Sequence, residues 1–181
     1  MPRTFIFVDL TGFTNFTAEQ GDDAAAGLLS SFRAVARETA SARGVRVAKW
    51  LGDGLMVVAI DQADGIAFAL DLEHNASQAC GALRLRTGIA TGYALLFEGD
   101  DYIGSAVNLA SRLSDAAGPG EVLLPVENLH DLPPGVHATP IGALDLPGFP
   151  EPVDVVELSG EAPPTAHFDT GELWTRTPFP V

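Results

Sequence analysis

The chain has 181 residues, a formal net charge of −14, 46% apolar residues and one cysteine, Cys80. This length suits one domain, or one domain with a tail, which buries roughly 70% of its unfolded surface without disulfides. The acidic balance excludes a nucleic-acid-binding protein, because the ten Lys and Arg residues are scattered. No apolar run reaches the roughly 18 residues of a membrane span. The lone cysteine and the lack of a signal-peptide pattern lead us to expect a cytoplasmic protein.

The first half of the chain opens with a strand and a long helical segment. The apolar residues 5–8 predict a buried strand that ends at the acidic residue Asp9. Residues 15–44 carry apolar side chains at helical spacing and predict helix. Asp22 or Asp23 is the expected cap of its main part.

The remaining segments alternate between strands and helices. We predict a hairpin with a Gly-Asp-Gly turn (45–60), a helix (63–79), a strand with a glycine-marked break (83–99), a helix (104–118), a short strand (121–125) and a last hairpin (135–158). This order predicts an α+β fold of the ferredoxin-like or palm-like kind, with a mixed, mainly antiparallel sheet and helices packed on one face. We expect one domain over 1–158 and a Pro-rich extended tail over 159–181, whose Trp174 and Phe179 indicate that it packs on its own domain or on a partner.

Two carboxylates stand out. Asp9 follows a core strand, where an unpaired charge is costly, and Asp53 lies between Gly52 and Gly54 in the predicted hairpin turn. If the two strands are neighbours, both carboxylates meet and can bind magnesium together with substrate phosphates. Simple structural roles remain open, since aspartate is common in tight turns, and an aspartate at a strand end can cap the next segment.

Three segments, in this order, carry a family resemblance: "FVDLTGFT", "KWLGDGLMVV" and "GDDYIGSAVNLASRL". They resemble the catalytic domain of class III nucleotidyl cyclases, the adenylyl and guanylyl cyclases. The resemblance runs from about Thr4 to Leu158, and the three motifs together are more specific than any one of them. It implies that the domain forms a homodimer whose two active sites each draw residues from both subunits.

The resemblance also implies a role for each matching residue. The metal ligands would be Asp9, Asp53 and the backbone carbonyl of Leu10, and the triphosphate would meet the amides of Thr11, Gly12, Phe13 and Thr14. Lys49 and Asp101 would recognise the purine base, Asn108 would orient the ribose, and Arg112 would stabilise the transition state.

Physical chemistry supports these roles separately. Asn108 and Arg112 are four residues apart on a predicted helix and therefore point the same way. Arginine suits phosphate because its planar guanidinium donates two parallel hydrogen bonds. Lys49 and Asp101 offer one donor and one acceptor, which match N1 and the N6 amino group of adenine, whereas guanine has the reverse pattern. The pair therefore favours ATP.

Each residue also has a structural alternative. Lys49 could be solvated, Asn108 could bond a neighbouring loop, Asp101 could serve a turn, and Arg112 could pair on the surface with Asp115 or Glu121.

Two further segments bear on phosphate binding. Residues 86–92, "RTGIATG", lack a P-loop pattern, and we expect their glycines to bend a strand. Relatives often carry a lysine in the last hairpin where this chain has Pro147, which has no donor. The cations that could substitute are Arg43, Arg46 and Arg176.

The resulting expectation is an adenylate cyclase that converts ATP to 3′,5′-cyclic AMP and pyrophosphate with two divalent ions, Mg²⁺ or Mn²⁺. The alternatives are a guanylate cyclase, a non-catalytic cyclase-like domain that binds nucleotide, and another two-metal enzyme on a palm-like sheet. A diguanylate cyclase typically has a "GGDEF"-like hairpin, whereas this turn reads "LGDGL".

Overall fold

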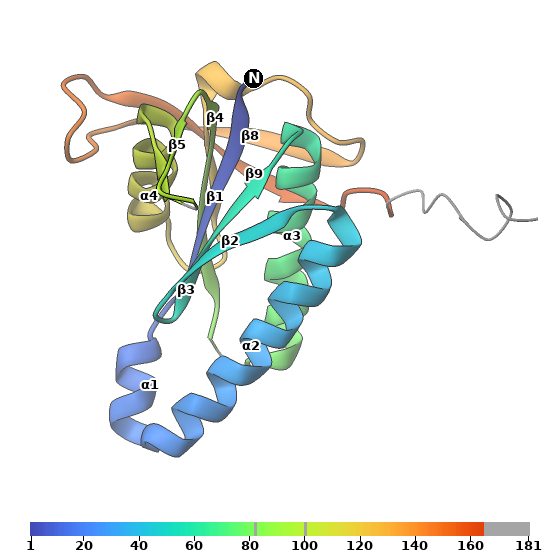
Figure 1. The fold of residues 1–181 in the computed structure, drawn as a ribbon, viewed down its shortest axis with the longest axis vertical. Coiled ribbons are helices and arrows are strands. Elements are labelled where there is room, and N and C mark those ends of the chain that lie inside the picture. The colour runs from blue at the N-terminus through green and yellow to red at the C-terminus, as the bar shows by residue number, and fades with distance from the viewer. Residues whose placement is uncertain (82, 100, 165–181) are drawn as a thin grey trace, which may run out of the picture.

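The computed structural model describes residues 1–164 apart from residues 82 and 100 (Figure 1). The first part of the chain forms β1 (Arg3–Leu10), α1 (Phe13–Gln20), α2 (Asp22–Arg43), β2 (Arg46–Leu51), β3 (Gly54–Ala59) and α3 (Gln62–Ala79). The second part forms β4 (Leu85–Gly92), β5 (Leu95–Phe97), β6 (Asp101–Ile103), α4 (Ser105–Ala116), β7 (Val122–Pro125), the 3₁₀ turn η1 (Val126–Asn128), β8 (Val136–Leu144) and β9 (Val153–Gly160).

Seven of these strands form one sheet in the order β2-β3-β1-β4-β7-β9-β8. The interior strand β1 is antiparallel to both β3 and β4, while β4 and β7 are parallel. The short strands β5 and β6 form a separate hairpin. The predicted α+β class with a mainly antiparallel sheet is confirmed.

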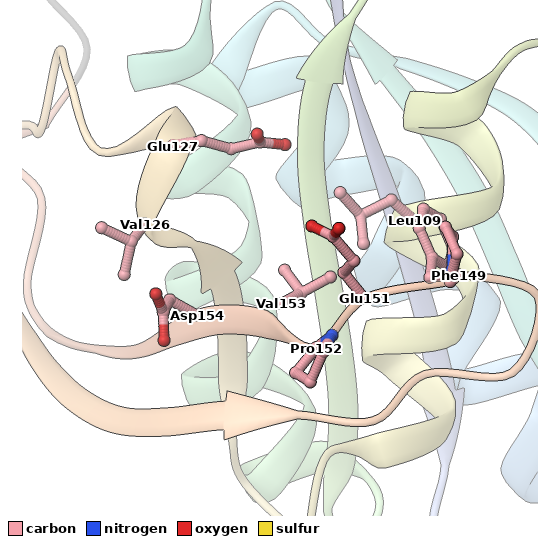
Figure 2. Close-up of a pocket in the computed structure, with 9 residues that line it drawn as sticks. Leu109, Val126, Glu127, Phe149, Glu151, Pro152, Val153 and Asp154 are labelled. Carbon is pink, nitrogen blue, oxygen red and sulfur yellow. The ribbon is translucent and has the colours of Figure 1, made fainter.

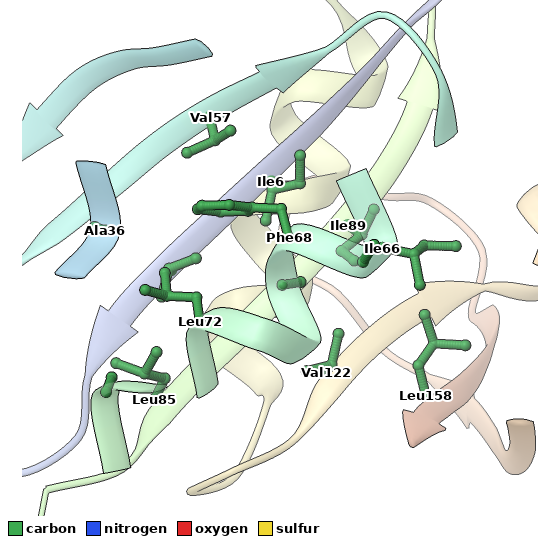
Figure 3. Packing of buried hydrophobic residues seen from close by; sticks show 14 of the residues in the cluster. Ile6, Ala36, Val57, Ile66, Phe68, Leu72, Leu85, Ile89, Val122 and Leu158 are labelled. Carbon is green, nitrogen blue, oxygen red and sulfur yellow. The ribbon is translucent and has the colours of Figure 1, made fainter. Parts of the chain in front are cut away.

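Helices cover both faces of this sheet. The helices α2 and α3 pack on one face, as expected, and bury Ile6, Phe68 and Leu72 in the larger core cluster (Figure 3). The helix α4 packs on the opposite face, where the side chains of Phe5 and Leu113 are buried in a second cluster, so the expectation that the helices pack on one face is corrected. Successive residues of a strand point to opposite faces, so a central strand that is apolar on both sides needs a helix on each.

The predicted long helix is interrupted at Gly21, which separates α1 from α2 with a positive φ of 86°. Gly21 is also the N-cap of α2, while Asp22 and Asp23 lie inside the first turn. The prediction of an aspartate cap was therefore wrong. Both carboxylates still suit this position, because the helix dipole is positive at its N-terminus.

The end of the described chain is tied to the domain. Arg43 pairs with Asp71 at 2.6 Å and donates to the carbonyl oxygens of Ala162 and Pro163. The predicted tail lies mostly outside the described residues, including Trp174 and Phe179, so the expected domain boundary stays a prediction. Within residues 1–164, apart from the two gaps, no helix combines the length and apolarity that crossing a bilayer requires.

Candidate active site

Strand pairing brings the two aspartates together. Asp9, at the end of β1, pairs with Gly54 at the start of β3, directly after Asp53. A Cβ atom on Gly54 would lie 2.5 Å from the carbonyl oxygen of Val8 and 3.2 Å from Oδ1 of Asp9. Only glycine permits this approach of the turn to the strand end. The side chain of Leu10 is buried in the core, so its backbone is what lines the pocket beside Asp9.

A third charged residue joins this site, and sequence analysis missed it. Arg86 on β4 pairs with Asp9 across the strands, and its Nε and Nη2 atoms donate to Oδ2 of Asp9 at 2.8 and 2.5 Å. Its Nη1 also donates to the backbone carbonyl of Asp115 in the last turn of α4, where the helix dipole is negative. Arg86 is thus the residue that Asp9 faces in this structure.

The electrostatics of Asp9 and Asp53 favour the binding of a cation. Burial raises the pKa of Asp53, and the nearby charge of Asp9 raises it further, whereas a backbone hydrogen bond and Arg86 lower it. The Asp53 carboxylate is therefore harder to ionise than an ordinary aspartate, and a nearby cation would favour its charged form. Carboxylate oxygens and a backbone carbonyl are the hard ligands that Mg²⁺ and Mn²⁺ prefer. The residues present therefore fit a divalent ion.

These residues surround a pocket of about 420 Å³. Its lining comes from the end of β1, the start of α1, the β2–β3 turn, β4 and the loop after α4: Asp9, Leu10, Thr11, Gly12, Phe13, Thr14, Asn15, Asp53, Arg86, Ala117 and Pro119. All the expected triphosphate and metal positions thus line one pocket, together with two polar residues that were not expected, Arg86 and Asn15.

The first turn of α1 supplies backbone donors to this pocket. The N–H groups of Phe13, Thr14 and Asn15 have no partner within the helix, because they belong to its first turn. Such groups bind anions well. Thr11 differs, because both its N–H and its hydroxyl group donate to the carbonyl oxygen of Arg84 at 2.8 Å. The Thr11 amide is therefore already bonded within the chain, its expected contact with the triphosphate stays a prediction, and the N–H of Asn15 is a further candidate donor.

The glycines of residues 86–92 serve helix packing rather than strand bending. A Cβ atom on Gly88 would lie 2.2 Å from the backbone carbonyl oxygen of Ala110, and one on Gly92 would lie 2.8 Å from the Cβ of Ala106. These glycines let α4 lie directly against β4. The close approach holds Arg86 beside the end of α4.

The two residues expected to recognise the base meet at the surface. Nζ of Lys49 on β2 donates to Oδ1 of Asp101 on β6 at 2.5 Å, although 52 residues separate them in the sequence. Both side chains are more than half exposed. The pair is therefore accessible to a ligand or to another protein surface.

The residues of α4 also divide between core and surface. Leu109 and Leu113 are buried against the sheet, while Asn108, Arg112 and Asp115 are exposed. Arg112 pairs with Asp115 at 3.1 Å, which was the structural alternative considered for it. An exposed pair of this kind contributes little to stability, so it does not restrain Arg112 strongly.

The expected site residues therefore form two separate groups in one chain. The pocket that contains Asp9 and Asp53 is not lined by Lys49, Asn108 or Arg112. In a single chain, the residues expected to bind metal and triphosphate line a pocket, and the residues expected to contact the base, the ribose and the transition state lie on the surface.

The structure also limits which basic side chain could replace the lysine that relatives often carry at the position of Pro147. Arg43 is engaged by Asp71 and the carbonyl oxygen of Pro163, and Arg46 begins β2 at the end opposite the Gly-Asp-Gly turn. Arg176 lies outside the described residues. Arg86 is the basic side chain that lines the pocket among the described residues.

A second pocket, of about 530 Å³, lies between α4, η1, the β8–β9 loop and β9 (Figure 2). Glu127, Glu151 and Asp154 line it together with apolar side chains such as Leu109. It contains none of the expected site residues.

Comparison with known proteins defines the class. A sequence model of the adenylate and guanylate cyclase catalytic domain matches residues 2–156. The chain therefore belongs to this family, the class III nucleotidyl cyclases.

Individual relatives agree. An adenylate cyclase of Streptomyces coelicolor is 31% identical over 174 residues, which cover 94% of this chain and 43% of that protein. An uncharacterised protein of Mycobacterium tuberculosis is 36% identical over 152 residues, 84% of this chain and 40% of that protein. The crystal structure of the adenylyl cyclase CyaB from P. aeruginosa superimposes with a TM-score of 0.72 at 28% identity, over 88% of this chain and 94% of that one. The chain spans about two fifths of the length of the two sequence relatives.

Proposed function

We propose that this chain is the catalytic domain of an adenylate cyclase, which converts ATP to 3′,5′-cyclic AMP and pyrophosphate in a homodimer with two shared sites. The observation that carries the proposal is the pocket in which two carboxylates, an arginine and the first turn of α1 meet. Carboxylates suit divalent ions, while guanidinium and amide groups suit phosphate oxygens. A metal-bound triphosphate is the ligand whose chemistry uses both.

Within this proposal, Asp9, Asp53 and the Leu10 carbonyl hold two divalent ions. Bound Mg²⁺ or Mn²⁺ would make the ribose 3′-hydroxyl a better nucleophile and neutralise charge on the leaving pyrophosphate. The amides of Phe13 and Thr14 orient the phosphates, and Arg86 turns from Asp9 to the phosphates and supplies the cation that Pro147 cannot.

The other group of residues acts on the nucleoside. Lys49 donates to N1 of adenine and Asp101 accepts from its N6 amino group. Asn108 orients the ribose, and Arg112 leaves Asp115 to stabilise charge that builds on the α-phosphate oxygens. The loss of such an arginine lowers the rate by roughly 10³-fold or more in comparable phosphoryl transfer.

A second subunit completes the site, because the two groups of residues are separate in one chain. The β5–β6 hairpin and Tyr93, two residues before it, expose large apolar side chains at 50% to 74%: Tyr93, Leu95, Leu96, Phe97 and Ile103. Several large exposed apolar side chains on one hairpin are typical of an interface. A two-fold symmetric dimer would form two composite sites.

The test is to incubate the purified protein with ATP or GTP, in Mg²⁺ or Mn²⁺, and to identify the products by mass. Cyclic AMP that disappears in Asp53→Ala is the expected result. Cyclic GMP would keep the two-metal chemistry and overturn the roles of Lys49 and Asp101. A folded dimer that binds ATP without forming any cyclic product would favour the non-catalytic alternative, for which Pro147 is the supporting observation.

A further inference from the structure

The β2–β3 turn that carries Asp53 is attached to α2 by an arginine. Nη2 of Arg33 donates to the backbone carbonyl oxygen of Gly52 at 3.1 Å. Gly52 has a positive φ of 65° and directly precedes Asp53. The bond therefore joins the helix to the residue that sets the direction of the turn.

Arg33 is itself held in place by Trp50. Its guanidinium carbon lies 5.0 Å from the centre of the Trp50 ring, and the guanidinium of Arg37, one turn further along α2, lies at the same distance. Such contacts contribute stability at a partly exposed site. Trp50 also packs against the larger core cluster, so the ring is fixed from below.

Holding Arg33 in this position costs free energy, and a role in general stability alone does not account for that cost. Its Nε is buried and has no hydrogen-bond partner among the described residues. An unsatisfied buried donor is unfavourable, and a solvated arginine would avoid it. The Nε atom of Arg33 therefore goes without a hydrogen bond while Nη2 of the same side chain contacts the turn.

We propose that Arg33 is a positioning residue that fixes the Gly52–Asp53–Gly54 turn, and hence the Asp53 carboxylate, through α2 and Trp50. The inference rests on the proposed metal-binding role of Asp53. Arg37 is the matched control, because it contacts the same ring at the same distance, and the hydrogen bond to the turn comes from Arg33.

The experiment compares Arg33→Met and Arg37→Met in the full chain carrying Trp174→Phe, which leaves Trp50 as the single tryptophan. Hydrogen exchange is followed in peptides that cover residues 50–56, without metal or nucleotide. Mn²⁺ is then titrated while Trp50 fluorescence is recorded, because paramagnetic Mn²⁺ quenches a nearby indole. Arg33→Met should speed exchange at the turn and raise the half-quenching Mn²⁺ concentration about five-fold, the equivalent of one hydrogen bond. Arg37→Met should change neither.

Equal effects of the two variants, or no effect of either, would overturn the inference. Arg33→Lys is the control for general unfolding, because it keeps a positive charge near Trp50 while its shorter side chain reaches Gly52 less well. Arg33→Lys should raise the half-quenching Mn²⁺ concentration less than Arg33→Met does. Hydrogen exchange in strands β1 and β4 should stay at the wild-type rate. Neither readout needs turnover. A selective effect of Arg33→Met in a protein that forms no cyclic nucleotide would uphold the positioning role and refute the proposed function. Equal effects in an active enzyme would do the reverse.

Discussion

Asp9 and Arg86 lie opposite each other in the β1–β4 pairing, and two nitrogens of Arg86 donate to a single carboxylate oxygen of Asp9. The two side chains are only 26% and 33% exposed, so solvent screens their interaction incompletely. Arg86 also lowers the pKa of the neighbouring Asp53. In metal-free protein this arginine is therefore the main counter-charge of the candidate metal site.

Replacing Arg86 by Met should destabilise the metal-free protein, because Asp9 and Asp53 then repel each other without compensation. We expect a loss of about 1 kcal/mol in the free energy of unfolding, measured by urea denaturation in EDTA. Mn²⁺ should restore part of this loss. Arg84→Met is the control, since Arg84 pairs with Glu73 and does not line the pocket, and Mn²⁺ should not affect its loss. A variant as stable as the wild type in EDTA would contradict the role assigned to Arg86.

Asp53→Asn should stabilise the metal-free protein at neutral pH. The pKa of Asp53 is raised in the folded state, first by burial and then by Asp9, so ionisation above that pKa costs folding free energy. The cost is absent when the pH falls below the ordinary pKa of an aspartate, about 3.9, because the group is then protonated in both states. The gain at pH 7 should be about 1–2 °C in Tm, since the carboxylate is partly solvated.

A matched variant separates electrostatics from metal binding in that experiment. Burial and the charge of Asp61 also raise the pKa of Asp64, which belongs to α3 and does not line the pocket. The gain in Tm of Asp64→Asn should depend on pH in the same way. Mn²⁺ should still stabilise Asp64→Asn, whereas it should no longer stabilise Asp53→Asn. If Mn²⁺ stabilises both variants equally, Asp53 is not a metal ligand.

Mixing two inactive variants tests the shared site. Asp9→Ala and Arg112→Ala should each form no cyclic AMP, because each variant homodimer lacks one required side chain in both of its sites. Random exchange makes half of the dimers heterodimers with one intact site, so the mixture should recover about a quarter of wild-type activity. Product is measured by mass, and heterodimers by native mass spectrometry. Silence of a mixture that demonstrably contains heterodimers would rule out composite sites.

Exchanging the charges of Lys49 and Asp101 tests base recognition. The double variant Lys49→Glu with Asp101→Lys keeps the surface ion pair but reverses the order of donor and acceptor. We expect kcat/KM for ATP to fall about 100-fold, because adenine would leave polar partners unsatisfied, and GTP to become the better substrate. The melting temperature serves as the control and should not change. An unchanged preference for ATP would remove both residues from base recognition.

Local signals in the sequence were sufficient for most of the fold and for the types of residue in the site. The apolar run in β1, the glycine-flanked turn at Asp53 and the helical spacing of α4 each depend on neighbours a few residues away. The division of 15–44 into α1 and α2 was missed, because a single glycine such as Gly21 is compatible with a continuous helix.

The sequence by itself indicated most of the residues that carry the candidate chemistry, although not Arg86 or Asn15, and the tertiary structure decided which of them meet. Asp9 and Arg86 are 77 residues apart, and their contact depends on strand order and register, which no local pattern encodes. The position of α4 on the second face likewise depends on how Gly88 lets the helix approach β4. The exposure of Arg112 and Asn108, separate from the pocket, follows from that packing, because a helix that buries one side must present the other to solvent.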